Sequence, residues 1–289
     1  MTLTQFAYRI VRTAAAATLC LGIAINAFAA KNPLNEPNGL AVDSKGNLYV
    51  ANSGGNNILV FNDKYQYLPA KTLVQGVFHP TGVAIDPMGN IWVTNYIQNE
   101  GSVTEYTNGQ QVASGTITEG VSSALAIAAD GSGNIWVQNA NSYVDVYSQP
   151  VLGQGSPTLT QTFNIAGPLY GISVWENTVA LGTASSFGVD FGNAFTTMEK
   201  GVFEGAFYVS NNTGLSITAD HQGGFYMGNL DGSVNHDNGS GETLFVQLSY
   251  QPAGAAVDTA HDRVYFSCFQ CNYIQAYSTT TGQLLETIQ

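Results

Sequence analysis

Two side chains near the start of the repeated part of the chain could do acid–base or metal chemistry together. Glu36 lies just before Pro37, and His79 lies in a related segment further along the chain. A carboxylate and an imidazole that meet can transfer a proton, but a transition-metal site needs three or four converging ligands. The remaining histidines are expected to be turn or surface residues: His221, His236 and His261.

The segment Cys268-Phe269-Gln270-Cys271 has the spacing of a redox motif. A redox motif of this kind is expected to open a helix, whereas this segment lies between two predicted strands. Two thiolates without a nearby histidine are also too few for a zinc site. We therefore predict a local disulfide between Cys268 and Cys271, which stiffens a loop and, because the loop is short, stabilises the fold only slightly.

Residues 1–29 have the pattern of a secretory signal. Arg9 and Arg12 precede the apolar run TAAAATLCLGIAIN, and Ala27-Phe28-Ala29 provides the small residues that a signal peptidase accepts. Leu19 argues against lipid modification of Cys20, since a small residue is expected there. The sequence thus predicts an exported protein, periplasmic or extracellular, with no transmembrane segment in the mature chain.

The charge of the chain excludes one class of partner. Loss of Arg9 and Arg12 with the signal leaves six basic residues against 20 acidic ones. Such a surface repels phosphate backbones, so we expect no nucleic-acid partner. Only 10% of the residues are charged and 32 are glycine, a composition that indicates β-structure with many tight turns.

A repeat that covers the mature chain predicts the architecture. The segment GLAVDSKGNLYVAN from Gly39 recurs as GVAIDPMGNIWVTN from Gly82 and AIAADGSGNIWVQN from Ala126, with weaker copies from Gly171, Gly214 and Gly254. Six units spaced by about 40 to 45 residues are typical of propeller blades. We predict an all-β, six-bladed propeller of four-stranded blades over residues 30–289.

Each unit contains the same predicted hairpin. A strand ends in an aspartate that can bind the amides of a D-x-x-G-N turn, and the next strand carries an aromatic residue that we expect to pack between blades. These aspartates are Asp43, Asp86, Asp130 and Asp258, and the aromatics include Tyr49, Trp92 and Trp136. Two units depart from the pattern: Trp175 replaces the aspartate in the fourth, and two extra residues precede Asp220 in the fifth.

Two further predictions concern the innermost and the outermost strands of the blades. Small residues in the first strand suit the crowded axis: Ala41, Ala84, Ala128, Ser173, Ser216 and Ala256. The fourth strand of the first blade is expected within AKTLVQG, and the last blade has its own outer strand in QLLETIQ. Whether residues 31–36 add to that blade is left open.

The run P-x-G-[LIV]-A-[VI]-D-x-x-G-N resembles the NHL repeat. The six-unit array is similar to the six-bladed NHL and gluconolactonase-like (senescence marker protein-like) propellers. The resemblance implies a divalent metal ion held at the channel mouth by acidic and asparagine side chains. Asn38 matches the asparagine of that pattern, but no aspartate matches its partner, and Glu36 is one residue out of register. We therefore predict no metal site, with Glu36 and His79 as weak candidates only.

The first strand begins, and the second ends, at the same mouth of the channel. The predicted ligand-binding residues at this mouth are Asn38, Asn52, Thr81, Asn95, Asn139, Tyr170 and Asn229, and further mouth positions are Leu125, Gly182, Thr213, Ala253 and Ser267 or Cys268. Amides and hydroxyls around a channel suit a neutral ligand.

Two functions are compatible with this mouth. The first is a monomeric binding module, without a cofactor, for a neutral small molecule, a glycan or a protein. The alternative is a lactonase-like hydrolase that holds a divalent cation through Glu36 and Asn38. We favour the first, because one amide and one misplaced carboxylate make a poor site for a hard cation.

Overall fold

The computed structural model describes residues 32–148, 156–165, 169–176, 178–183, 194–199, 202–208, 214–238 and 241–289. The chain divides into residues 1–33 and a second unit, residues 34–289, and every described strand belongs to the second unit. The predicted signal sequence, residues 1–29, lies outside the described residues. Among the described residues, no helix has the length and apolar character needed to cross a membrane.

The second unit consists of six antiparallel sheets that follow one another along the chain. The first blade contains β1 (Pro37–Val42), β2 (Leu48–Asn52) and β3 (Asn57–Phe61); the second contains β4 (Pro80–Ile85), β5 (Ile91–Ile97), β6 (Glu100–Tyr106) and β7 (Gly115–Ile117); the third contains β8 (Ala124–Ala129), β9 (Ile135–Asn139), β10 (Tyr143–Ser148) and β11 (Thr158–Asn164). The fourth contains β12 (Leu169–Trp175), β13 (Thr178–Thr183), β14 (Ala194–Glu199) and β15 (Val202–Tyr208); the fifth contains β16 (Gly214–Ala219), β17 (Phe225–Asn229), β18 (Ser233–Asp237) and β19 (Glu242–Gln247); the sixth contains β20 (Pro252–Asp258), β21 (Arg263–Cys268), β22 (Tyr273–Ser278) and β23 (Leu284–Ile288).

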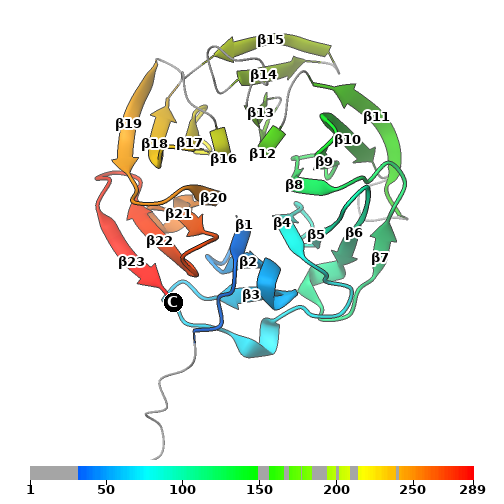
Figure 1. Ribbon diagram of the computed structural model, residues 1–289, viewed down its shortest axis with the longest axis horizontal. Coiled ribbons are helices and arrows are strands. Elements are labelled where there is room, and N and C mark those ends of the chain that lie inside the picture. Colours follow the sequence, from blue (N-terminus) through cyan, green and yellow to red (C-terminus); the bar gives the residue numbers. More distant parts are fainter. Residues whose placement is uncertain are drawn as a thin grey trace, which may run out of the picture. The chain divides into compact units, whose positions relative to one another are not determined.

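The sheets form a closed ring around an axis (Figure 1). The first strand of each blade contacts the first strand of the next, from β1 through β4, β8, β12 and β16 to β20, and β20 contacts β1 again. Apolar side chains of neighbouring blades pack together in the spaces between the sheets. The predicted all-β propeller is therefore confirmed, with five four-stranded blades and one smaller blade.

The smaller blade is the first, where the prediction of a fourth strand within AKTLVQG was wrong. Pro69–Lys71 forms a short 3-10 turn there, beginning at a proline that cannot donate to a β-ladder. The segment makes only an isolated bridge between Leu73 and Ile58. Leu73 is nevertheless fully buried and fills the outer edge of the blade.

The turn aspartates have the structural role that the sequence predicted. Asp86 Oδ1 accepts hydrogen bonds from the backbone N–H groups of Met88 and Asn90, both at 2.9 Å. Its Oδ2 accepts one from Trp92 Nε1 at 3.0 Å, and Trp92 packs against Ile127 of the next blade. The same amide contacts recur at Asp43 and Asp130.

The sequence predicted departures from this turn in the fourth and fifth blades, and the structure gives a different outcome for each. Trp175 pairs with Thr178 across a shorter turn. In the fifth blade, the predicted two-residue insertion was wrong, because Gly214 pairs with Asn229 as Pro37 pairs with Asn52. Leu215 therefore occupies the position of Asn38, and Thr218 that of Ala41. Ser216, predicted at the position of Ala41, holds that of Gly39 instead. Thr213, predicted at the mouth, lies outside the described residues.

Close approach of the innermost strands explains the glycine of the P-x-G run. A Cβ atom added to Gly39 would lie 2.7 Å from the Cα of Gly82 in the next blade. A side chain there would force the two strands apart. Packing of the innermost strands therefore accounts for this glycine without a role in ligand binding.

A backbone hydrogen bond to an asparagine side chain joins the sixth and first blades, where the ring closes. A second bond of the same kind joins the first blade to the second. The Glu36 N–H donates to Asn272 Oδ1 at 2.7 Å, and the His79 N–H donates to Asn56 Oδ1 at 2.8 Å. Residues 32–36 contain no strand, but Leu34 is buried in the core cluster of these two blades. Closure therefore depends on packing and these asparagine links.

Candidate functional site

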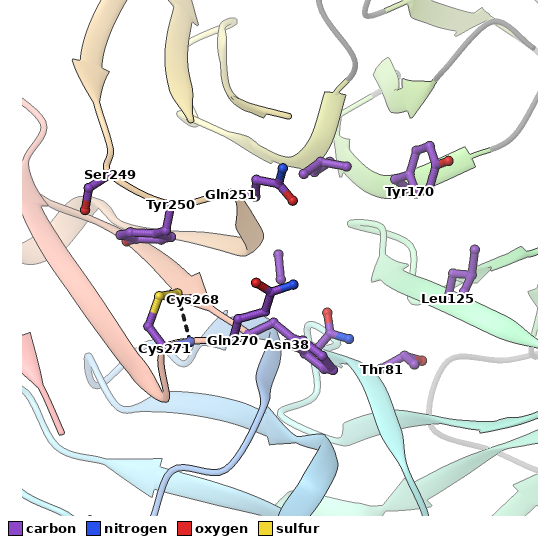
Figure 2. A pocket seen from close by; sticks show the side chains of 13 residues that line it. Asn38, Thr81, Leu125, Tyr170, Ser249, Tyr250, Gln251, Cys268, Gln270 and Cys271 are labelled. Atoms are coloured by element: carbon purple, nitrogen blue, oxygen red, sulfur yellow. Dashed lines mark hydrogen bonds between the residues drawn. A yellow bond between two sulfur atoms is a disulfide. The ribbon is translucent and has the colours of Figure 1, made fainter. Parts of the chain in front are cut away.

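A cavity of about 770 Å³ lies at the end of the ring where the innermost strands begin. Each blade contributes the residue at the position of Asn38 in the first strand: Asn38, Thr81, Leu125, Tyr170, Leu215 and Ala253. Figure 2 shows Asn38, Thr81, Leu125 and Tyr170 around the opening. Deeper along the axis, between the same strands, there is a space of only about 50 Å³. The mouth is an open pocket above a nearly filled axis.

One wall of this cavity comes from the sixth blade and the segment leading into it. We call residues 249–251 and 268–271 the blade-6 wall. Tyr250 and Gln251 line the cavity from the first segment, and Phe269 and Gln270 line it from the second. Figure 2 shows Tyr250, Gln251 and Gln270 there. Cys268 and Cys271 are joined by the predicted disulfide, with their Cα atoms 5.2 Å apart.

The lining of the mouth cavity carries no aspartate, glutamate, lysine, arginine or histidine among the residues that the structure describes. Burial, helped by the neighbouring Tyr277 and Tyr273, raises the pKa of the Tyr250 phenol. Its hydroxyl donates a hydrogen bond to the Phe266 carbonyl at 3.2 Å. The cavity therefore presents amide, hydroxyl, aliphatic and aromatic groups that are uncharged at neutral pH.

Of the predicted ligand-binding residues, the structure brings Asn38, Thr81 and Tyr170 together at the cavity. Tyr170 is 40% exposed. The Thr81 hydroxyl donates to the Ala124 carbonyl at 2.8 Å, which links two blades at the rim. These three residues have the location that the sequence predicted, and their binding role stays a prediction.

The other four asparagines do not line the cavity, which revises the expectation of an asparagine rim. Asn52, Asn95, Asn139 and Asn229 are all at most 2% exposed. The Oδ1 atoms of the first three accept a backbone N–H from the segment that enters the same blade, at Asn35, Phe78 and Ser122 respectively. We call Asn52, Asn95 and Asn139 the asparagine clamp. Asn229 Nδ2 donates to Ser233 Oγ at 3.0 Å.

Sequence reasoning missed Leu215 and most of the blade-6 wall. Leu215 was missed because Gly214 was matched to Gly39 by residue type, although it pairs as Pro37 does. A signal for the wall was present in the sequence, since Cys268 stands where four other blades have an asparagine. That substitution marks the sixth blade, like the fourth with Thr183, as one whose entrance is built differently.

The two weak metal candidates lie outside the cavity lining. Glu36 and His79 occupy equivalent corners of adjacent blades, with φ of 55° and 40°. Among the described residues, the close contacts between a histidine and a carboxylate are His236 with Asp220 and His261 with Asp258. No group of three His, Cys, Asp or Glu side chains with metal-binding geometry occurs in that part of the chain. Asn38 lines the cavity without Glu36 beside it.

A second cavity, of about 930 Å³, opens at the opposite end of the ring among the turns. Its lining includes Lys45, Lys71, Trp175, Glu176 and His221. Burial lowers the pKa of His221, although Asp220 opposes this effect. The two ends of the propeller thus differ in chemistry, with charged groups at the turn end and neutral groups at the mouth.

Comparison with known proteins supports the propeller and the repeat. The NHL repeat model matches residues 34–61. Virginiamycin B lyase from Staphylococcus aureus has a similar structure, with a TM-score of 0.61, 16% identity and coverage of 89% of this chain and 85% of that chain. A gluconolactonase from Xanthomonas campestris gives a TM-score of 0.64 and 13% identity, covering 82% and 84%.

A catalytically inactive variant of the Staphylococcus aureus lyase with quinupristin also matches, at a TM-score of 0.62 and 15% identity, covering 90% of this chain and 85% of that chain. A comparison with curated proteins found no match. At these identities the likeness concerns the fold. The chain contains an NHL repeat and folds as a propeller like these lyases and lactonases.

Proposed function

We propose that this protein is a binding propeller that holds a neutral, partly apolar small molecule in the mouth cavity. The observation that carries the proposal is the absence of charged and histidine side chains from the described lining of a cavity of about 770 Å³. Cavities of this order suit small-molecule ligands. Burying an ion in such a lining would leave its charge unpaired, which is costly.

The lining also indicates how a ligand would be held. Leu125, Leu215 and the ring of Tyr170 offer apolar contact, while Asn38 and Gln270 offer amide donors and acceptors. A flat or cyclic ligand with amide or hydroxyl groups fits this combination better than a long charged chain does. A glycan or a protein segment is a less suitable occupant, because the site is concave and rich in apolar groups.

We propose that the protein acts outside the cytoplasm as a monomer. The support is the sequence pattern of residues 1–29 and the acidic composition of the mature chain. A disulfide between Cys268 and Cys271 is consistent with an oxidising compartment.

Binding of the uncharged fluorophore N-phenylnaphthylamine to the purified protein tests the proposed site. We expect saturable binding that Leu125→Asp and Tyr170→Ala each weaken by about tenfold, because both remove apolar contact from the cavity. Met88→Asp is the matched control, since Met88 is 50% exposed and lines the cavity at the opposite end. Unsaturable binding, or equal affinity in the mouth variants and the wild type, would contradict the proposal.

The second candidate function is a lactonase-like or lyase-like enzyme. It is favoured by the fold shared with the gluconolactonase and virginiamycin B lyase and by the position of Asn38 at the mouth. Assays of gluconolactone hydrolysis and of virginiamycin B cleavage, each with added divalent cations, distinguish it from a binding module. Turnover that Asn38→Ala abolishes would replace our proposal.

A further inference from the structure

We propose that the Cys268–Cys271 disulfide positions the part of the mouth that recognises the ligand, so that a dithiol which reduces it weakens binding. This inference rests on the proposed function of the mouth cavity and names its regulation. It concerns the blade-6 wall, which contributes seven of the lining residues: Ser249, Tyr250, Gln251, Cys268, Phe269, Gln270 and Cys271.

The disulfide encloses the two residues of the wall that project from the β21–β22 corner. Phe269 and Gln270 lie between the bonded cysteines, and both line the cavity. Phe269 is partly buried, whereas Gln270 is exposed. A covalent bond across two residues restricts the backbone that carries both side chains, which lowers the entropy lost when a ligand orders them.

The sixth blade lacks the asparagine clamp that holds the entrance of three other blades. Cys268 pairs with Pro252 as Asn52 pairs with Pro37 and Asn95 with Pro80. Each clamp asparagine accepts the N–H of the residue 17 positions earlier. In each case this donor lies two residues before the first-strand residue that pairs with the asparagine, so the equivalent residue in the sixth blade is Tyr250, and Cys268 offers it no amide oxygen.

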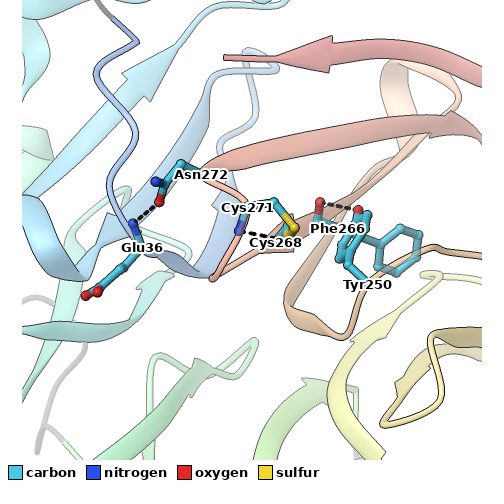
Figure 3. The surroundings of a disulfide bond; sticks show 6 residues. All are labelled: Glu36, Tyr250, Phe266, Cys268, Cys271 and Asn272. Atoms are coloured by element: carbon cyan, nitrogen blue, oxygen red, sulfur yellow. Dashed lines mark hydrogen bonds between the residues drawn. A yellow bond between two sulfur atoms is a disulfide. The ribbon is translucent and has the colours of Figure 1, made fainter.

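The sulfur of Cys268 makes a hydrogen bond within the β21–β22 corner of its own hairpin. Its Sγ accepts the N–H of Cys271 at 3.1 Å, as Figure 3 shows. The base of the corner is held separately, by the Asn272 N–H donating to the Cys268 carbonyl at 3.2 Å and by the link from Asn272 to Glu36. Cleavage of the disulfide would therefore loosen Phe269 and Gln270 while the hairpin and the blade closure remain.

The two sulfurs differ in access. Cys268 is 1% exposed, whereas Cys271 is exposed. A thiolate of an external dithiol would attack Cys271 Sγ, form a mixed disulfide and release Cys268 as the thiolate. The second thiol of the reagent then displaces Cys271, which leaves two cysteine thiols and the cyclic oxidised reagent. Two electrons pass from the dithiol to the protein, and its two protons end on the cysteines.

Titration with N-phenylnaphthylamine tests the inference on three forms of the full chain: oxidised wild type, wild type reduced with dithiothreitol, and Cys268→Ser/Cys271→Ser. We expect the reduced form and the serine variant to bind about tenfold more weakly than the oxidised form. The melting temperature should change little, because a disulfide that closes so short a loop adds little stability. Dithiothreitol should leave the affinity of the serine variant unchanged.

A second variant tests the role of the missing clamp. Cys268→Asn/Cys271→Ser places an asparagine where the other blades have one, so we expect it to bind more tightly than the serine variant. Failure to do so overturns the comparison with the clamp, and equal affinity of the oxidised and reduced wild type overturns the inference as a whole. If the oxidised wild type does not bind the probe, or if Leu125→Asp binds it as tightly as the wild type does, the result instead contradicts the proposed function.

Discussion

At the scale of single residues, the same amino acid has two roles in this fold, and position decides between them. Asn38 lines the mouth cavity, whereas Asn95 is 2% exposed and holds its blade together. Asn95 Oδ1 accepts from the Phe78 N–H at 2.9 Å, and its Nδ2 donates to Thr104 Oγ1 at 2.9 Å. The sequence predicted both as mouth residues because both flank the repeat, but only the first faces the cavity.

We therefore expect opposite effects from two matched substitutions. Asn95→Ala should lower the free energy of unfolding by about 2–3 kcal/mol, because it leaves buried partners such as the Phe78 N–H without an acceptor. Asn38→Ala should change it by less than about 0.5 kcal/mol and should instead weaken binding of N-phenylnaphthylamine. Urea denaturation and probe titration of both variants check this pair. Similar stability of the two would contradict the assignment of the clamp.

A second residue-scale prediction concerns pH and the exposed Asp262 in the β20–β21 turn. Hydrogen bonds from the hydroxyls of Thr279 and Ser278, and from the Thr280 hydroxyl and N–H, lower the pKa of Asp262 from 3.8 to about 2. Because the folded-state pKa lies below the unfolded one, this stabilisation is present above about pH 4. It is lost as the pH falls through about 2.

Solvent screening limits the contribution of this exposed group to roughly 1 kcal/mol. Urea denaturation at several pH values between about 5 and 2 measures it. We expect Asp262→Asn to be less stable than the wild type at the upper end of this range and to lose less stability on acidification. Parallel curves for the two proteins would show that the turn makes no such contribution.

At the scale of elements, the sequence identified the hairpins well and their register less well. The D-x-x-G-N turns and the aromatic residues that come after them were predictable, because each satisfies a local need for turn acceptors or for packing between sheets. Register in the fifth blade was not, since Gly214 resembles Gly39 in type while the hydrogen bonds place it opposite Asn229. The first blade lost its predicted fourth strand to the turn at Pro69.

The blade-6 wall shows where local patterns stop being informative. Tyr250 and Phe269 belong to segments between predicted strands, so no periodicity marks them as cavity residues. They meet only because β20 and β21 pair in a register that brings Pro252 beside Cys268. The disulfide could be predicted from the spacing of its cysteines, but its place in the wall of the cavity required the fold.

At the scale of the whole molecule, the two ends of the propeller are lined by different kinds of side chain. Charged side chains line the turn end, and neutral ones line the mouth. Closure of the ring does not require a strand from residues 32–36, since Asn272 links to Glu36 as Asn56 links to His79. The repeat could predict six blades, a mostly neutral mouth and aspartates at the turn end, whereas Lys45, Glu176 and His221 at the turn end occupy positions that the repeat leaves variable.

The central claim, that the mouth receives a neutral ligand, is tested most directly by comparing two probes of similar shape. N-phenylnaphthylamine is uncharged, and anilinonaphthalene sulfonate carries the same rings with a sulfonate. We predict that the wild type binds the neutral probe at least about tenfold more tightly, since the described lining offers no cation to the sulfonate. We also predict that Leu125→Asp weakens binding of the neutral probe without making the sulfonate bind more tightly, because the added carboxylate repels the sulfonate. Equal or tighter binding of the sulfonate at the mouth would contradict the account.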